Sequence, residues 1–434
     1  MSSSKSAEES ISTLKALLYG YGNLMGVGSA LIVQWLLYYY CPPPNSGMTP
    51  YAPIIAMGAV ILFGRIVDAV SDPLIGYWSD KTITRWGRRK PFIVMGFILL
   101  ALSLILVWIP LVPYESMINA IYAAVLLGVF WFGFTAAIAP YLALLPEIAT
   151  TREDRVKLST FQALFSQVSL IISGVAVPVL LGILGFLNTA AVLALIGFTA
   201  MLAVVLGIKE KHVAEEKIAK KMSLWEAVKV TATNKVFLLY LIPTAILVLS
   251  TTMLQTALSY AVTVSGGLTK QDVSLFYLPL IILSIITLPL YKKLATTYGK
   301  KKIYLFGMTM FIIPTLMISF IGIVPIDPRI YLIISGVVAG FFVTPLLMLP
   351  NAIIADITDV DEQITGYRRE AMYFGTQGLI TKTMAGLAGV VVSALLGFFG
   401  YAPGNDLGIR LVYIVGALLL VPAALIFTKY PIEK

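Results

Sequence analysis

Runs of about twenty consecutive apolar residues recur along the whole of this 434-residue chain. An α-helix needs about that many residues to cross the hydrocarbon core of a bilayer. The pattern predicts an all-α integral membrane protein with about twelve transmembrane helices. The expected spans are roughly 14–41, 50–78, 91–112, 116–147, 158–186, 189–208, 236–262, 269–296, 303–324, 329–355, 370–400 and 407–428.

The composition supports this class and excludes several others. Charged residues make up only 12% of the chain, whereas a soluble domain carries about 25%. There is one cysteine, Cys41, and one histidine, His212. A disulfide framework, a Cys/His zinc site and a membrane-buried Ser-His-Asp triad are therefore excluded. We find no buried set of nucleophile and base, so we do not expect an enzyme.

The net charge of +9 follows membrane topology. Lys and Arg gather in alternate connections, after the second, fourth, sixth, eighth and tenth spans, while the stretch 41–50 has none. This is the positive-inside pattern, and it places both termini in the cytoplasm of a plasma-membrane protein. Because the basic residues follow the orientation of the chain in the membrane and do not form a patch for polyanions, we expect no nucleic-acid partner. The lipid bilayer is the expected surrounding, and a monomer is the expected state.

The longest polar stretch, 209–235, divides the spans six and six. It predicts an N-terminal bundle over 1–208, a central cytoplasmic loop over 209–235 and a C-terminal bundle over 236–434, related by pseudo-symmetry. The connection after the second span reads Gly76-Tyr77-Trp78-Ser79-Asp80-Lys81, then Gly87-Arg88-Arg89-Lys90, and 291–302 holds a weaker echo. This loop resembles the G-x-x-x-D-[RK] … G-[RK]-[RK] signature of the major facilitator superfamily.

Two carboxylates in the second span are the strongest functional signal. Asp68 and Asp72 are four residues apart, so they lie on one helix face. Ionisable groups at membrane depth are costly and point to function. Such a pair favours a shared cation or a titrating proton. Ser71 is a further candidate for the cation site because it could add a hydroxyl, although it points about 100° away. The alternative is a static network in which Arg65 neutralises Asp68, with Lys382 of the other half as a partner for Asp72.

A second polar cluster lies at the predicted cytoplasmic ends of both halves. Mixed charges at matching depths there predict a gate of ion pairs, each worth only about 0–1 kcal/mol. A solvated loop is the alternative. The expected gate residues are Arg152, Glu153, Arg155, Asp356, Asp359, Glu362, Arg368 and Glu370.

The polar motifs together resemble those of the glycoside-pentoside-hexuronide:cation symporter family of the major facilitator superfamily. Residues 65–73 are similar to its R-I-x-D-A-x-x-D-P motif, 85–91 to its R-W-G-[RK]-x-[KR]-P loop, and 355–370 to A-D-x-x-D-x-x-E-x(5)-R-x-E. The resemblance implies that Asp68, Asp72 and Thr135 form the cation site. It places Lys382 near both cation and solute.

The sequence departs from this family in its sugar pocket. Two acidic positions that hold sugar hydroxyls align with Gly26 and Ile138, two aromatic positions with Leu142 and Leu347, and an arginine with Gln162. We therefore expect no transport of melibiose-like galactosides. Besides Lys382, the polar and aromatic groups nearby that remain as candidates for contacting solute are Asn23, Gln34, Trp131, Tyr141, Gln162, Asn351, Tyr373 and Gln377.

The resemblance implies a symporter that couples Na⁺ or H⁺ to a small organic solute by alternating access. The leading solute class is a sugar, glycoside or sugar acid. A more apolar cargo such as a lysolipid, and a membrane sensor that has kept the fold but not transport, stay open as alternatives. No cofactor is expected beyond the co-transported cation.

Overall fold

The computed structural model describes residues 11–44, 46–82, 84–149, 151–210, 231, 233–366 and 369–432, and this part of the chain is almost entirely helical. The helices of the first half are α1 (Thr13–Tyr21), η1 (Gly22–Gly26), α2 (Ser29–Tyr40), α3 (Ile54–Lys81), α4 (Lys90–Leu106), α5 (Met117–Ile148), α6 (Arg152–Ile171), η2 (Ile172–Ala176) and α7 (Val177–Gly207). Those of the second half are α9 (Lys235–Tyr260), η3 (Ala261–Ser265), η4 (Lys270–Val273), α10 (Ser274–Tyr298), α11 (Lys300–Met310), α12 (Ile312–Ser319), α13 (Pro328–Met348), α14 (Pro350–Thr365), α15 (Glu370–Phe399) and α16 (Leu407–Phe427).

Each of the expected spans has a helix in the described part of the chain. Ten helices there are long and apolar enough to cross a membrane, and Lys90–Leu106 is a shorter apolar helix. One of the ten, Arg152–Gly207, contains two passages, because the chain reverses at Gly185, whose φ of 74° is available to glycine without strain. The prediction of an all-α membrane protein is confirmed.

Helix ends follow local capping rules. The side chains of Ser116, Thr151, Asn234 and Asp327 accept hydrogen bonds from the first backbone N–H groups of α5, α6, α9 and α13, which have no partner inside the helix. Outward-facing positions are apolar: Ile121, for example, is 62% exposed. An apolar exposed surface of this kind is what lipid requires.

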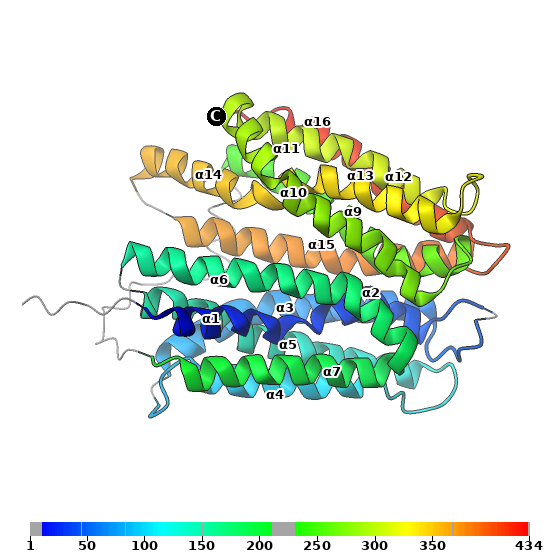
Figure 1. Cartoon of the computed structure of the whole chain (residues 1–434), viewed down its shortest axis with the longest axis horizontal. Helices are drawn as coiled ribbons and strands as arrows, with labels where there is room; N and C mark the ends of the chain where they lie inside the picture. The colour runs from blue at the N-terminus through cyan, green and yellow to red at the C-terminus, as the bar shows by residue number, and fades with distance from the viewer. Residues whose placement is uncertain are drawn as a thin grey trace, which may run out of the picture.

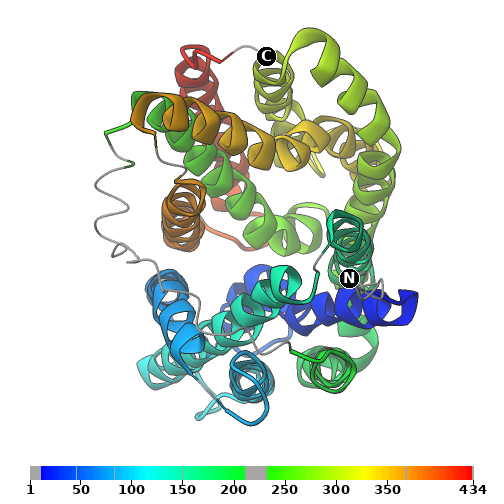
Figure 2. The same cartoon turned by 90° about the vertical axis from the view of Figure 1, so that its left-hand side faces the viewer.

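The helices form two groups that lie side by side. Figures 1 and 2 show α1 to α7 in one group and α9 to α16 in the other. Residues 211–230 of this connection lie outside the described residues, so the domain division at 209–235 stays a prediction. The two groups meet along α3 and α15 and through α2 and α9.

Glycines on α15 let α3 approach closely. A Cβ atom added to Gly389 would lie 2.6 Å from Cγ2 of Ile61, and one added to Gly386 would lie 2.9 Å from Cβ of Arg65. Small residues are the usual means by which transmembrane helices come into close contact. This contact brings the polar side chains of α3 within reach of α15.

The contact between α2 and α9 is made by hydrogen bonds across the two halves. The Thr256 hydroxyl donates to the Val33 carbonyl at 3.4 Å, and the Tyr260 hydroxyl donates to the Cys41 carbonyl at 2.7 Å. The helices therefore meet from the middle of α2 to its C-terminal end.

Candidate functional site

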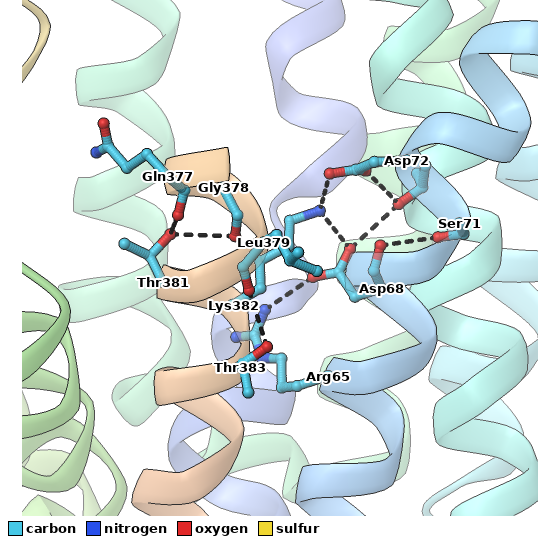
Figure 3. A network of polar contacts seen from close by, with 11 residues as sticks. Arg65, Asp68, Ser71, Asp72, Gln377, Gly378, Leu379, Thr381, Lys382 and Thr383 are labelled. Atoms are coloured by element: carbon cyan, nitrogen blue, oxygen red, sulfur yellow. Dashed lines mark hydrogen bonds and ion pairs between the residues drawn. The ribbon is translucent and has the colours of Figure 1, made fainter. Parts of the chain in front are cut away.

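The two carboxylates of α3 face a lysine of the other half. The Lys382 ammonium on α15 lies 2.8 Å from Oδ1 of Asp68 and 2.7 Å from Oδ2 of Asp72, and Figure 3 shows it between them. Asp68 is 1% exposed, whereas the Asp72 side chain is 43% exposed. The Lys382 side chain of the second half therefore forms ion pairs with both carboxylates of the first half.

Thr135 of α5 completes this arrangement from the other side. Its buried hydroxyl lies 3.1 Å from a carboxylate oxygen of Asp68 and 3.1 Å from one of Asp72. A hydroxyl has a single proton, so it donates to one carboxylate at a time. Ser71 points elsewhere, because its hydroxyl donates to the backbone carbonyl of Asp68 at 3.0 Å. Thr135 therefore faces the pair and Ser71 does not.

Arg65 adds a second cation to the network. Its guanidinium donates to Oδ2 of Asp68 at 3.2 Å and lies over the Trp131 ring, 3.7 Å from the ring centroid. The two acids and two bases thus cancel in formal charge. Both pairings that the sequence suggested are present together: Arg65 contacts Asp68, and Lys382 contacts Asp72. Lys382 also contacts Asp68.

Carboxylate and hydroxyl oxygens are ligands that a hard alkali cation accepts. Asp68, Asp72 and Thr135 supply such oxygens from two helices, and Lys382 now occupies the place where their oxygens converge. A cation that enters has to displace the ammonium, and a proton has to neutralise a carboxylate that the ammonium holds. Either event weakens a link between the two halves.

Most of the other residues expected at the solute site lie apart from this network. The Tyr141 hydroxyl donates to the backbone carbonyl of Tyr19, and the Asn23 amide donates to the Ser166 hydroxyl at 2.9 Å. These contacts tie neighbouring helices of the first half together. Trp131 alone among the aromatic candidates touches the network, through Arg65.

Of the remaining candidates, Gln34 lies on α2, Asn351 on α14, Gln162 on α6, and Tyr373 and Gln377 on α15. Tyr373 accepts a hydrogen bond from the Asn234 amide at 2.7 Å, and Gln377 lies 3.5 Å from the Tyr240 hydroxyl. Gln377 points away from the carboxylates in Figure 3. Gln162 is half-buried on α6. Their roles in solute binding stay predictions.

The expected gate residues begin and end helices. Arg152, Glu153 and Arg155 lie in the first turns of α6, Asp356, Asp359 and Glu362 lie on α14, and Glu370 begins α15. Arg368 lies outside the described residues. Lys300 of α11 lies 2.6 Å from the Asp356 carboxylate, which ties α14 within its own half. The gate between halves stays a prediction.

Two partners at this end were not expected from the sequence. Asp361 holds Arg369 through two hydrogen bonds, and this bonding raises the pKa of Arg369 above its ordinary value. Glu147 of α5 lies 2.7 Å from Arg88 and 3.0 Å from Arg89. In the sequence, only the mixed charges of segments 147–155 and 355–370 indicated that ion pairs would form here.

Glu210 was also missed. Its carboxylate accepts hydrogen bonds from the backbone N–H groups of residues 88, 89 and 90 at the start of α4, at 2.6–3.0 Å for the shortest contact with each. A Cβ at Gly87 would overlap this carboxylate, and the φ of Gly87 is 106°. Gly87 of the loop motif therefore leaves room for the Glu210 carboxylate. The spacing of the motif does not reveal this reason for a glycine.

The comparisons with known proteins agree with this architecture. The family model described as "MFS/sugar transport protein" matches residues 18–434. The uncharacterized symporter YjmB of Bacillus subtilis is 26% identical, with 96% of this chain and 90% of its own length aligned. The sodium-dependent lysophosphatidylcholine symporter 1 of Xenopus tropicalis is 22% identical, over 87% of this chain and 80% of its own length.

Among solved structures, a mutant of the nucleoside transporter NupG superposes with a TM-score of 0.71 at 14% identity, covering 96% of this chain and 99% of that one. A likeness at this identity shows the fold, which is that of a membrane transporter. The resemblance drawn from the polar motifs is confirmed by the family match. The chain belongs to the MFS/sugar transport protein family and is a multi-pass membrane transporter, not an enzyme.

Proposed function

We propose that this protein is a symporter that couples a monovalent cation, Na⁺ or H⁺, to the movement of a small organic solute. The observation that carries the proposal is the bridge from Lys382 to both Asp68 and Asp72, with the Thr135 hydroxyl 3.1 Å from each acid. A cation that replaces the ammonium removes the ionic link between α15 and α3. The halves can then change their relative position around a site near the membrane midplane.

Coupling requires that the solute and the cation strengthen each other's binding by the same factor. In this proposal the cation removes a link that holds one arrangement of the halves, and the solute adds contacts to both halves. No resident cofactor takes part. The positive-inside charge pattern supports the proposal that both termini lie in the cytoplasm of a plasma-membrane protein, and one copy of the chain contains the whole network.

The leading solute class is a sugar, glycoside or sugar acid, as the family description and the polar motifs suggest. A more apolar cargo such as a lysolipid is the second candidate, because one relative is named a lysophosphatidylcholine symporter. Competition experiments distinguish the two solute classes, because acyl chains and detergents compete for a lipid site and sugars compete for a sugar site.

The experiment is a thermal unfolding series on purified protein with Na⁺, Li⁺ and pH varied. A cation that binds only the folded state raises stability by RT ln(1 + [L]/Kd). We expect a specific rise with one cation in the wild type and its loss in Asp68→Asn. Asp406→Asn is the matched control, since Asp406 pairs with Arg410 elsewhere at 2.7 Å. An unchanged cation response in Asp68→Asn contradicts the coupling role.

A further inference from the structure

A cavity of about 450 Å³ lies between the two halves, away from the charged network. Its walls come from α2, α6 and η2 of the first half and from α9, α10 and α13 of the second, with Phe311 between α11 and α12. Its size falls within the range of about 300–1,000 Å³ that is usual for small-molecule sites. Nothing in the mechanism above uses it.

All 22 described residues that line this cavity are uncharged. Most are apolar, and the polar ones are hydroxyls and two amides. An ion placed here would lose its hydration without gaining a counter-charge, which is strongly unfavourable. Arg65, the charged residue of a neighbouring small cavity that shares Val33 with this one, is already engaged with Asp68 and Trp131.

One amide in the cavity wall lacks a hydrogen-bond partner for its nitrogen. Gln34 of α2 is 5% exposed, and its amide nitrogen has no hydrogen-bond partner among the described residues. A buried donor that is left unpaired costs about 1–3 kcal/mol, and such groups are rare in native structures. An oxygen acceptor on a bound solute would satisfy it.

A second amide faces the cavity from the other half. The Thr256 hydroxyl of α9 donates to the carbonyl of Val33 on α2, and the adjoining residues, Gln255 and Gln34, both line the cavity. Gln34 and Gln255 therefore each adjoin, on their own helix, one residue of the same contact between the halves. A solute that bonds to both would hold α2 and α9 together.

We infer that this cavity is the solute site, that it takes an uncharged solute with an apolar body and oxygen acceptors, and that Gln34 and Gln255 determine its specificity. The inference rests on the proposed function and narrows it. It favours a glycoside with an apolar aglycone over a sugar acid, a free sugar or a lysolipid with a charged headgroup.

The test compares solutes that differ by one property, on the full chain in lipid nanodiscs. The probes are 4-nitrophenyl glycosides of several neutral sugars, 4-nitrophenyl glucuronide, the free sugars and lysophosphatidylcholine. Affinity is read from ligand titrations of the unfolding midpoint. We expect at least one neutral aryl glycoside to bind, with the glucuronide and the free sugars at least about tenfold weaker, because an uncompensated charge or a lost apolar contact is costly.

Gln34→Leu is expected to weaken the neutral glycoside about tenfold, since it removes the donor that the solute satisfies. Gln167→Leu, the same change on α6 outside the cavity lining, is the matched control and keeps full affinity. Tighter binding of the glucuronide, binding of lysophosphatidylcholine alone, no binding by any neutral glycoside, or equal affinity in Gln34→Leu overturns the inference.

Failure of the symporter proposal has a different signature. If cations do not act through Asp68, the glycoside still binds, but its affinity is the same with and without Na⁺ across the pH range. If only the cavity assignment is wrong, the cation response of the wild type persists while Gln34→Leu has no effect on solute affinity.

Discussion

Where α3 meets α15, the two halves are joined by charges and close packing, whereas α2, α6 and η2 enclose an uncharged cavity with α9, α10 and α13. On the first side, Lys382 bridges Asp68 and Asp72, and Gly389 allows contact with Ile61. On the second, the walls carry only hydroxyls, amides and apolar groups. The cation and the solute are therefore expected to act at different places on one interface.

This separation explains how each ligand can influence the other without touching it. Both proposed sites lie between the two halves, so a ligand bound at either one would shift the equilibrium between arrangements of the halves. Val33 of α2 lines both the solute cavity and the smaller cavity that Arg65 lines. In the proposed mechanism, the halves are the two-state element that coupling requires.

The largest expected effect is on the charged side. Lys382→Met leaves two carboxylates with one base, and we expect the free energy of unfolding to fall by about 2–3 kcal/mol. This is below the roughly 3–5 kcal/mol for a fully buried pair, because the Asp72 side chain is 43% exposed. Thermal and denaturant unfolding in detergent measure it.

The double variant Lys382→Met/Asp72→Asn restores charge balance, so it should recover more than half of the lost stability. A single variant as stable as the wild type would show that the charges do not hold the halves together.

The packing of the charged side is tested next. Gly389→Val places a side chain against Ile61, where even a Cβ lies 2.6 Å from the Cγ2 atom, and we expect a loss of about 1–3 kcal/mol from overpacking. Gly378→Val on the same helix is the control, because a Cβ there meets nothing within 4 Å. Equal unfolding midpoints for the two variants would argue against a close α3–α15 contact.

A smaller effect is expected from the hydroxyl that faces both acids. Thr135→Val removes a hydrogen bond to a charged group and should weaken binding of the coupling cation about tenfold, whereas Thr135→Ser should retain it. A cation titration of the unfolding midpoint gives the affinity. The assignment of Thr135 fails if valine and serine variants bind the cation equally.

The smallest effect belongs to the uncharged side. Leu347 lines the cavity and is 64% exposed, so Leu347→Ala should change the free energy of unfolding by no more than about 0.5 kcal/mol. A loss above about 2 kcal/mol would mean that the cavity wall is part of the packed core, and the contrast between the two sides would not hold.

Sequence alone could predict the charged side, because each charge at membrane depth is informative by itself. Asp68 and Asp72 share a face by spacing, and Lys382 is an isolated base in an apolar helix. Thr135 came from the family resemblance, since a hydroxyl in a span has many ordinary roles. The helices were predictable for the same reason as the charges: lipid permits few alternatives.

The residues of the uncharged side could not be predicted from the sequence in this way. Tyr141 packs on Tyr19, with ring centroids 4.9 Å apart, and its role at the solute site stays a prediction. An aromatic residue on a helix has the same sequence pattern in a core and in a cavity. Gln34 was one polar candidate among several, and only its unpaired amide sets it apart. The role of Gly389 depends on Ile61, more than 300 positions earlier in the chain.

The turn at Gly185 also bears on how the protein enters its membrane. Between Lys157 and Lys209 the chain has no charged residue, and its two passages are joined at one glycine without a polar loop. No charged segment has to be translocated between them, so the two spans can leave the insertion machinery as a single helical hairpin. In the orientation that the positive-inside pattern predicts, basic residues at both of its ends, such as Arg152 and Lys209, stay on the side where synthesis takes place.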